Sequence, residues 1–468
     1  MAQPMPKHPN LVGGFAPIQM ECDAPDLVIE GEVPADLCGT FFRNGPNPQF
    51  APRGGHHWFA GDGMLHAFHI ENGRVGYKNR WARTKKFELE RAAGRALFSA
   101  FNPMDADPSV VGMETDGLAN TNIVWHGGRL LALEEGHAPF EFDPNSLASK
   151  GAWDFGGRLE GPMTAHPKID PETGEMLFFG YSTSGPMSKG MSFHVVSADG
   201  ELTESQVFDA PYSSMVHDFM VTQNYVLFPI MPLSGSLDRA MRGGPAFAWE
   251  PELGTYLGVL KRGESVDKIR WFEGSPSYVF HPMNAFEQDG KLICDVCEYP
   301  EAPLFPRPDG SMGDPSKANA KLHWWTLDVD GDTNTYKSEP LDDRFSEFPR
   351  LDERRAGLSY RHGYFACQGG EKSATQNFSA IAHIDHELDR VAVCDFGGHV
   401  GTSEPIFVAS GETEGEGYLL ANLYDAREDK SQLVILDAQN VSDGPIARAF
   451  LDHRVPFGFH GNWRPLDA

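Results

Sequence analysis

Turn-forming dipeptides recur along the chain between short apolar runs, and this pattern restricts the fold more than any other feature. They are Asn72-Gly73, Gly127-Gly128, Thr173-Gly174, Asp199-Gly200, Asp289-Gly290 and Asp330-Gly331, with Gly415-Glu416-Gly417 as a longer variant. The flanking runs, such as RLLALEE, EMLFFGY and KLICDVCEY, are rich in strand formers. Turn dipeptides between such runs are typical of β-hairpins. The sequence therefore predicts an all-β, mostly antiparallel protein.

The 468 residues contain no Pro- or Ser-rich linker and no break in composition. Many hairpins in one uninterrupted chain of this length favour a β-propeller over several sandwich domains. We therefore expect a single propeller domain over residues 1–468. The sequence repeat is too degenerate to count the blades.

Two short segments depart from the strand pattern. In KKFELERAAGRALFSAF, apolar residues from Leu89 to Ala100 recur at helical spacing, which predicts one helix face. The second segment is SLDRAM, with Ser236 as its N-cap. We expect both helices to be insertions that cap one face of the β body, where they either roof a site or simply pack on the strands.

The formal net charge is −27, from 39 basic and 66 acidic residues spread along the chain. Such a charge repels phosphates and argues against binding to nucleic acids or anionic membranes. No signal-peptide core and no run of eighteen apolar residues can be found, so we expect a cytoplasmic protein without stable membrane insertion. The six cysteines fit reduced, buried thiols better than a disulfide framework.

Sequence motifs of several common site types are missing or incomplete. The segment 328–334, DVDGDTN, resembles a calcium loop, but Thr333 stands where the loop requires glycine, so a plain turn is favoured. No GxSxG, P-loop, HExxH or dinucleotide-binding motif is present. Hydrolase, nucleotidase and zinc-protease functions therefore lose their usual support.

Four of the 18 histidines share one sequence setting. Each follows an apolar residue and precedes Pro, Asp or Gly, as a side chain at a strand edge would: His166 in MTAHPKID, His217 in MVHDFM, His281 in YVFHPMNA and His460 in FGFHGNW. Taken singly, each would ordinarily be satisfied by a backbone carbonyl. Their separations are close to multiples of a propeller blade of roughly 40–60 residues, and equivalent positions in different blades converge. The pattern therefore predicts four imidazoles at one point.

Imidazole is a ligand for iron, copper, zinc and nickel. A ligand histidine normally donates its second N–H to a carboxylate, which orients the ring. Glu135, Glu347 and Glu404 are candidates, because each stands beside strand-like apolar residues where an unpaired carboxylate would be costly. Each alone would be read as a surface ion pair. Together with the four histidines they predict a supported metal site.

The ordered motifs resemble the carotenoid cleavage oxygenase family over nearly the whole chain. They are FFRNGPNPQF, HHWFAGDGMLHAFHI, TAHPKIDPETGEMLFFGY, MVHDFMV, FHPMNAFEQDG, SEFPR, SEPIFV and FGFHGNW. The resemblance implies a seven-bladed propeller that holds Fe(II) on His166, His217, His281 and His460. It also implies that Glu135, Glu347 and Glu404 support three of these histidines, with the pairing left open. The family-motif histidines His56, His57 and His66 look structural.

Within the family, FNPMDADPSV, FAWEPELGTYLGVL and SQLVILDAQN look closest to bacterial lignostilbene dioxygenases and isoeugenol-cleaving oxygenases. This branch implies O2-dependent cleavage of an alkene conjugated to a phenol, with aldehyde products. Phe59, Thr121 and Phe305 match residues that line the substrate cavity, with Thr121 near the open iron position. Core packing is the alternative for the two phenylalanines.

Two positions depart from the stilbene-cleaving pattern. A Tyr and a Lys that bind the substrate hydroxyl there correspond to Phe101 and Glu134 here, and Glu134 would repel a phenolate. Either Glu134 accepts the phenol proton, or the substrate lacks that hydroxyl. An apocarotenoid cleavage dioxygenase and a non-catalytic, metal-free scaffold are the alternative functions. A mono- or dioxygenase outcome and the oligomeric state stay open, with a homodimer among the alternatives.

Overall fold

The computed structural model describes residues 3–99 and 105–466. It divides into two compact units. The first unit comprises residues 1–160, 368–383 and 391–468, and the second comprises residues 161–367 and 384–390. A single domain over the whole chain stays a prediction.

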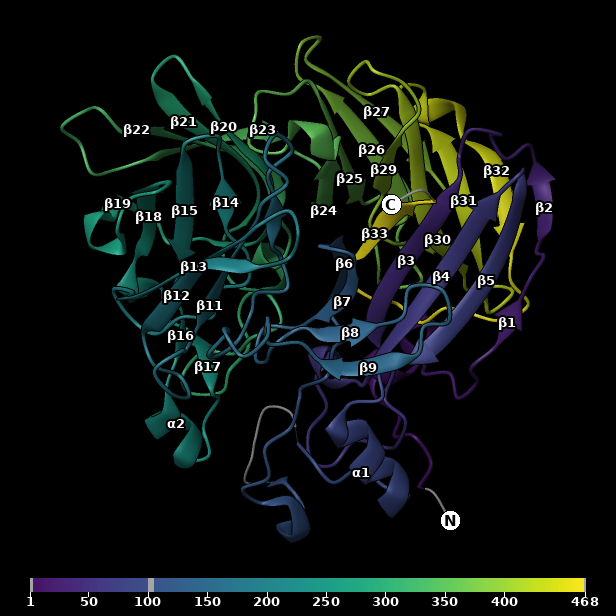
Figure 1. The fold of residues 1–468 in the computed structure, drawn as a ribbon, viewed down its shortest axis with the longest axis horizontal. Helices are drawn as coiled ribbons and strands as arrows, with labels where there is room; N and C mark the ends of the chain where they lie inside the picture. Colours follow the sequence, from purple (N-terminus) through teal and green to yellow (C-terminus); the bar gives the residue numbers. More distant parts are fainter. Residues whose placement is uncertain (1–2, 100–104, 467–468) are drawn as a thin grey trace. The chain divides into compact units, whose positions relative to one another are not determined.

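The described strands form seven sheets of four to six strands each and one two-stranded ribbon (Figure 1). Neighbouring strands are joined mainly as antiparallel hairpins. Seven such sheets correspond to the blades of a seven-bladed β-propeller. The predicted all-β fold class is therefore confirmed.

Three sheets belong to the first unit. The first runs in the order β1 (Asp23–Ala24), β5 (Arg74–Trp81), β4 (Gly63–Glu71), β3 (Gly39–Pro46) and β33 (Gly461–Pro465). The second contains β6 (Asn122–His126), β7 (Arg129–Leu133), β8 (Phe140–Phe142) and β9 (Ser149–Ala152). The third contains β2 (Val28–Gly31), β32 (Pro445–Phe450), β31 (Lys430–Asp437), β30 (Gly417–Asp425) and β28 (Val400–Thr402), and β29 (Ile406–Ala409) also pairs with β30.

The second unit holds three four-stranded sheets and the ribbon. The first sheet contains β10 (Lys168–Ile169), β11 (Met176–Tyr181), β12 (Gly190–Val196) and β13 (Leu202–Asp209). The second contains β14 (Met220–Val221), β15 (Tyr225–Ile230), β18 (Thr255–Lys261) and β19 (Arg270–Gly274). The third contains β20 (Tyr278–Gln288), β21 (Lys291–Tyr299), β22 (Lys321–Asp328) and β23 (Lys337–Asp342). The ribbon pairs β16 (Leu233–Gly235) with β17 (Phe247–Trp249).

The seventh sheet runs in the order β24 (Ser346–Leu351), β25 (His362–Cys367), β26 (Ala380–Asp385) and β27 (Arg390–Asp395). Several of the expected dipeptides form turns between paired strands in the other sheets. Asn72-Gly73 and Asp289-Gly290 connect paired strands, and both residues of each pair have positive φ values between 51° and 74°. Asn, Asp and Gly adopt this conformation most readily, which explains why these residues recur between the strands.

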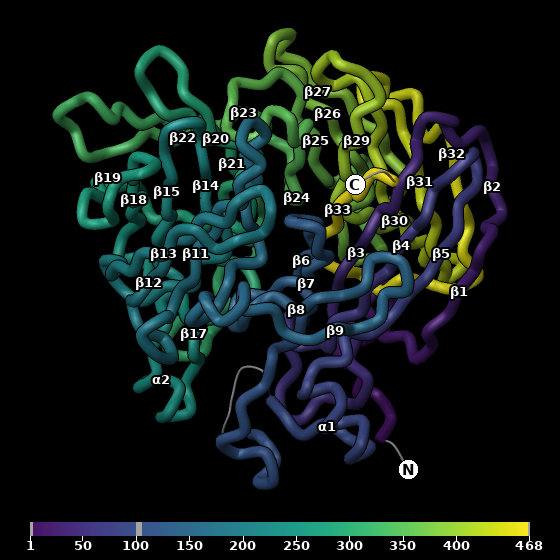
Figure 2. Tube along the Cα trace, viewed as in Figure 1, coloured from purple at the N-terminus to yellow at the C-terminus, as the bar shows by residue number. Residues whose placement is uncertain are grey.

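Early and late strands of the chain share sheets of the first unit (Figure 2). β2, near the N-terminus, pairs with the late strand β32. β33, near the C-terminus, pairs with the early strand β3. Because His460 directly precedes β33, pairing with β3 determines where its backbone lies.

The first predicted helix is present but shorter than its predicted face from Leu89 to Ala100, and Ala100 itself lies outside the described residues. α1 spans only Lys85–Ala93 and ends at Gly94, whose φ of 67° allows the left-handed C-cap. Its buried residues are Lys86, Phe87 and Glu90. The Lys86 ammonium bonds to the carboxylates of Asp62 and Glu90, and Phe87 belongs to an apolar cluster with Met64 and Trp81. The other predicted helix is confirmed as α2 (Leu237–Met241), with the Ser236 hydroxyl accepting from the Arg239 amide.

Arg270 donates hydrogen bonds to the loop 328–334, whose sequence resembles a calcium site. The Arg270 guanidinium donates to the carbonyls of Val329, Gly331 and Thr333 and to the Asn334 side chain, all at 2.8 Å. These oxygens therefore already face a cation of the protein itself. Among the helices of the described residues, none is long and apolar enough to cross a membrane.

Candidate metal centre

The four motif histidines lie at strand ends or at a break in a strand. His166 and His217 precede the short strands β10 and β14, and His460 precedes β33, as the sequence predicts. His281 instead lies inside β20. Pairing with β21 is interrupted on both sides of Pro282, which lacks an N–H for the ladder. A bulge of this kind can re-aim a neighbouring side chain, and this one lies next to His281.

Three imidazoles of the second unit converge through the same ring nitrogen. The His217 Nε2 atom lies 3.0 Å from Nε2 of His166 and 3.1 Å from Nε2 of His281. Ligand atoms that share one metal ion about 2.1 Å away lie about 3.0–3.4 Å apart. The spacing therefore allows one ion to be bound by these rings together.

All four motif histidines are at least nine-tenths buried. Among the described residues, His166, His217, His281 and His460 form a group of ligand side chains that could hold a metal ion. Neutral imidazole is a good ligand for divalent transition metals, and no cysteine or carboxylate belongs to the group. The donor set therefore fits Fe(II).

Glu347 orients His281. Its Oε2 atom accepts from His281 Nδ1 at 2.5 Å and from the Phe348 amide at 2.7 Å, and its Oε1 atom accepts from the Tyr299 hydroxyl at 3.0 Å. Because Nδ1 of His281 donates its hydrogen, Nε2 keeps its lone pair for a metal. Pairing of β24 with β25 is also interrupted after Glu347, in the SEFPR motif.

Glu404 makes the corresponding contact with His460 in the first unit. Its Oε1 atom accepts from His460 Nδ1 at 3.0 Å, and its Oε2 atom accepts from the Gly461 amide at 3.0 Å. Both side chains are at most 4% exposed. Two of the glutamate pairings that the sequence left open are thus Glu347 with His281 and Glu404 with His460. Support of a third histidine by Glu135 stays a prediction.

His166 has an acidic neighbour that the sequence analysis missed. Its Nδ1 atom lies 3.7 Å from Asp218 Oδ2, and Asp218 Oδ1 accepts from Lys168 Nζ at 2.8 Å. Burial raises the pKa of the Asp218 carboxyl, against the opposing effect of Lys168. Both residues lie within two positions of a motif histidine, in HPK and HDF. This proximity in the sequence was the signal that could have identified Asp218 and Lys168 as neighbours of the histidines.

Thr121 and Phe59 lie close to His460 in the first unit. The His460 amide donates to the Thr121 carbonyl at 3.1 Å. Phe59 belongs to the short helix η3 (Trp58–Ala60), and its ring packs against Phe459 with ring centres 5.3 Å apart. Phe305 is buried in the second unit. Phe101 lies outside the described residues.

Glu134 is paired with a histidine. Its carboxylate accepts from Nδ1 of His137, and its side chain is only 15% exposed. Burial lowers the pKa of His137, but the hydrogen bond and charge of Glu134 outweigh it, so the pKa is raised above its usual value. A Cβ atom on Gly117 would lie 2.3 Å from Glu134 Oε1, so a glycine is needed beside the pair.

The other motif histidines make local contacts. His57 caps η3 by accepting from the Phe59 amide at 3.2 Å. His66 hydrogen-bonds the Tyr77 hydroxyl at 2.7 Å, and burial, with His453 and Arg43 nearby, lowers its pKa to about 3. Burial also lowers the pKa of His56 to about 4. These contacts agree with structural roles.

A seven-bladed propeller with a buried four-histidine group defines a class of metal-dependent oxygenases. The family model described as retinal pigment epithelial membrane protein matches residues 15–465, and the chain belongs to this family, which is the carotenoid oxygenase family. It is therefore an enzyme of the carotenoid and stilbene cleavage type.

Three similar proteins illustrate the relationship. The isoeugenol monooxygenase of Pseudomonas nitroreducens is 37% identical, over 98% of both proteins. The crystal structure of Pseudomonas brassicacearum lignostilbene dioxygenase matches with a TM-score of 0.95 and 34% identity, over 99% of this chain and 100% of that one. The cobalt-substituted apocarotenoid oxygenase of Synechocystis matches with a TM-score of 0.86 and 29% identity, over 97% of this chain and 98% of that one.

Proposed function

We propose that the chain is an Fe(II)-dependent oxygenase that uses O2 to cleave the alkene C=C bond of a stilbenoid or phenylpropanoid-type aromatic compound into aldehydes. The single observation that carries this proposal is the group of four buried histidines. The similarity to an isoeugenol monooxygenase and a lignostilbene dioxygenase supports the substrate class. The net charge of −27 argues against nucleic-acid or anionic-membrane partners.

His166, His217, His281 and His460 would hold the iron. The bound metal supplies the one-electron chemistry that O2 needs to react with an alkene. Glu347 and Glu404 hold the rings of His281 and His460 with their Nε2 lone pairs available. Support of a third motif histidine by Glu135 is part of this proposal, with its partner left open. Four neutral ligands leave the ion its full positive charge.

The aromatic residues Phe59 and Phe305 would line the substrate cavity. Phe59 packs against Phe459, and Trp58 packs against the same ring with centres 4.6 Å apart. Apolar aromatic surfaces of this kind bind a flat ring and exclude water from the reacting bond. Thr121, through its backbone contact with His460, belongs beside the metal in this proposal.

Glu134 would accept a hydrogen bond or a proton from the substrate's phenol hydroxyl. Phe101 has no hydrogen-bonding group, so a substrate hydroxyl would have to find its acceptor elsewhere. The Glu134 carboxylate can accept a hydrogen bond or a proton from that hydroxyl, and the paired His137 balances its charge. The alternative is a substrate without a free hydroxyl, for which Glu134 and His137 would be a structural ion pair.

A substrate panel tests this function. Iron-loaded protein would be incubated with isoeugenol, 4-hydroxystilbenes, their methyl ethers and apocarotenals, and products would be identified by mass spectrometry. We expect aldehydes from the free phenols, and at least a tenfold loss with methyl ethers or in Glu134→Gln, on the order of what general acid–base groups contribute. Equal turnover of the methyl ethers would contradict the role of Glu134.

Other outcomes separate the remaining alternatives. Exclusive turnover of apocarotenals would replace the aromatic substrate class with apocarotenoid cleavage. Protein that binds no iron and turns over nothing would be a scaffold. Labelling with 18O2, followed by measurement of label in both aldehydes, distinguishes a dioxygenase from a monooxygenase.

A further inference from the structure

We propose that Asn120 is a positioning residue that holds the Thr121 side chain and the Phe59 segment in a fixed arrangement beside His460. This inference rests on the proposed function, because it concerns the walls of the same site. Asn120 belongs to none of the motifs noted in the sequence, and its role follows from hydrogen bonds within the first unit.

The amide of Asn120 has only one consistent orientation. The side chain is 2% exposed, and its Nδ2 atom donates to the carbonyls of Phe59 at 2.8 Å and Gly61 at 2.7 Å. Two carbonyl oxygens can only accept, so the atom that faces them must be the NH2 group. The other end of the amide, Oδ1, is therefore an acceptor.

This orientation determines the state of the Thr121 hydroxyl. Thr121 Oγ1 lies 3.0 Å from Asn120 Oδ1. Since Oδ1 carries no hydrogen, the hydroxyl must donate the one that it has. Thr121 can then offer only lone pairs to a neighbouring molecule. It can accept from a phenol or a water, but it cannot donate to O2. The bond also holds the side chain in one rotamer.

Backbone contacts connect Thr121 to the metal centre. Its carbonyl accepts from the His460 amide at 3.1 Å, and its amide donates to the Leu133 carbonyl at 3.0 Å. Thr121 is thus held between the start of β33 and the end of β7. The Asn120 bond therefore orients a side chain whose backbone is already fixed relative to His460.

A second buried asparagine, Asn44, hydrogen-bonds the backbone of the segment that contains Thr121. Asn44 Nδ2 donates to the carbonyls of Ala119 and Asn122, both at 2.9 Å, and the Asn44 amide donates to the His460 carbonyl at 2.8 Å. Ala119 has a φ of 50°, a left-handed value that is unfavourable for alanine. The segment 119–122 is therefore held in a conformation that it would not adopt alone, which is common at functional sites.

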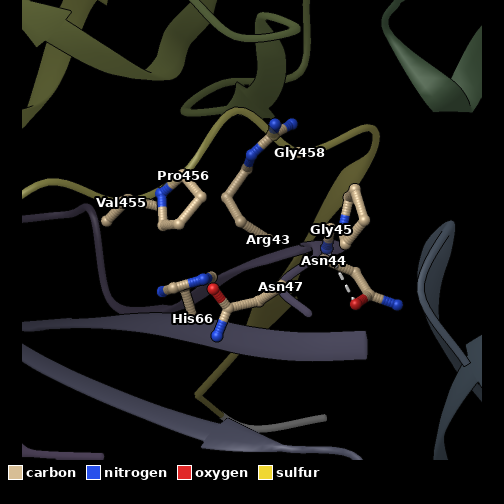
Figure 3. A pocket seen from close by; sticks show the side chains of 9 residues that line it. Arg43, Asn44, Gly45, Asn47, His66, Val455, Pro456 and Gly458 are labelled. Carbon is tan, nitrogen blue, oxygen red and sulfur yellow. Dashed lines mark hydrogen bonds between the residues drawn. The ribbon is translucent and has the colours of Figure 1, made fainter. Parts of the chain in front are cut away.

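Figure 3 shows residues around a small cavity beside Asn44. Asn44 and Gly45 on β3, together with Val455, Pro456 and Gly458, line one small cavity with Arg43 and His66. Arg43 donates to the Phe459 carbonyl at 2.9 Å. A Cβ atom on Gly458 would lie 2.5 Å from the Asn44 carbonyl oxygen, so glycine is required for this approach.

The second function of Asn120 is to hold the Phe59 segment. The Phe59 carbonyl accepts from Nδ2, and the Phe59 ring lies against Phe459, the residue before His460. One amide therefore joins a hydroxyl expected near the metal to an aromatic side chain expected at the substrate ring. Thr121 depends on Oδ1 and Phe59 depends on Nδ2.

These two dependences can be separated by substitution. Asn120→Ala removes both, whereas Asn120→Asp keeps an acceptor for Thr121 but loses the donors to Phe59 and Gly61. We expect N120A to raise KM for O2 about threefold. It should also weaken binding of 4-propylguaiacol, a saturated substrate analogue without the alkene, about fivefold. Both effects are of the size found for residues in direct contact. N120D should weaken only binding of the analogue.

Double-mutant cycles test whether Asn120 acts through these two residues. In a Thr121→Val background, N120A should change KM for O2 by less than about twofold, and in a Phe59→Ala background it should change the Kd of 4-propylguaiacol by less than about twofold. The Kd is measured by tryptophan fluorescence without turnover. Unchanged effects of N120A in both backgrounds, or an equal change of both constants in N120D, would overturn the proposal.

Asn79 provides the matched control. It is fully buried in the same unit, and its side chain bonds the Cys22 amide and the Met20 carbonyl, away from Thr121 and Phe59. Asn79→Ala should lower the melting temperature without changing KM for O2 or the Kd of the analogue. The same changes in N79A as in N120A would reduce Asn120 to a general structural role. A wild-type protein without iron or turnover would instead refute the proposed function.

Discussion

At the scale of single residues, the site depends on carboxylates that orient imidazoles. Glu347 accepts three hydrogen bonds, one each from His281, Phe348 and Tyr299. An amide in its place cannot accept with both ends. Glu347→Gln would therefore leave at least one buried donor unpaired or let the His281 ring turn.

We predict that E347Q weakens iron binding about 10–100-fold, the usual effect of losing the partner of a ligand histidine. Iron retention after dialysis against a chelator, measured by elemental analysis, checks this. Glu301→Gln is the control, because Glu301 is also buried in the second unit but pairs with Arg307 and Lys317. Equal iron retention in E347Q and wild type would show that Glu347 does not orient a ligand.

His194 is predicted to make the fold sensitive to acid. It is buried, its Nε2 atom has no hydrogen-bond partner, and burial lowers its pKa to about 4. The unfolded protein binds a proton near pH 6.5, whereas the folded protein resists it until about pH 4. Stability is therefore complete above pH 6.5 and is lost as the pH falls through this window, by about 3 kcal/mol for the full pKa difference.

His194→Gln should flatten the stability profile between pH 6.5 and 4 relative to wild type. The measurement is urea unfolding at several pH values in this range. His323→Gln serves as the control, because His194 and His323 each hydrogen-bond a serine hydroxyl but His323 is part-exposed. An unchanged slope in H194Q would mean that another group carries the acid sensitivity.

At the scale of elements, irregularities in the strands position the ligands. His281 and Glu347 both stand at interruptions of their strands, beside Pro282 and Pro349. Phe348 adopts a φ of 53° at the second interruption. Around the start of β33, two glycines allow a close approach to β3. Gly458 and Gly461 would each place a Cβ within 2.5 Å of a backbone oxygen of β3.

Gly458→Ala should therefore push the segment that carries His460 away from β3. We expect a loss of about 1–3 kcal/mol in stability, as for other overpacked sites, together with weaker iron binding. Thermal unfolding and elemental analysis measure the two effects. Gly370→Ala is the control, because its Cβ would make only one ordinary contact at 3.7 Å. A G458A protein with wild-type iron and melting temperature would contradict the role of this approach.

These elements also show how far sequence reasoning reaches. Asn72-Gly73 and similar turns predict the hairpins because their conformation is local. The first helix is shorter than predicted because Gly94 ends it, and its inner face consists of Phe87 and the buried Lys86–Glu90 pair rather than the predicted apolar row. The pairing of Glu347 with His281, 66 residues apart, was open because it depends on tertiary contacts. Asp218 and Asn120 were missed for the same reason.

At the scale of the whole molecule, seven sheets make one architecture from residues that are distant in the sequence. In the first unit, β33 lies on β3 and β2 lies on β32, so early and late parts of the sequence share sheets. The four motif histidines come from segments spread over about three hundred residues, from His166 to His460. Metal binding therefore reports on the assembly of most of the protein.

The most direct test is the iron content of purified, iron-loaded wild-type protein and of His217→Ala, measured by elemental analysis with circular dichroism as the check on folding. His217 is the histidine whose Nε2 atom lies within 3.1 Å of two others. We predict one iron per protein molecule and alkene cleavage in the wild type, and loss of both in a folded H217A protein. An H217A protein that keeps its iron and its activity would contradict the four-histidine centre.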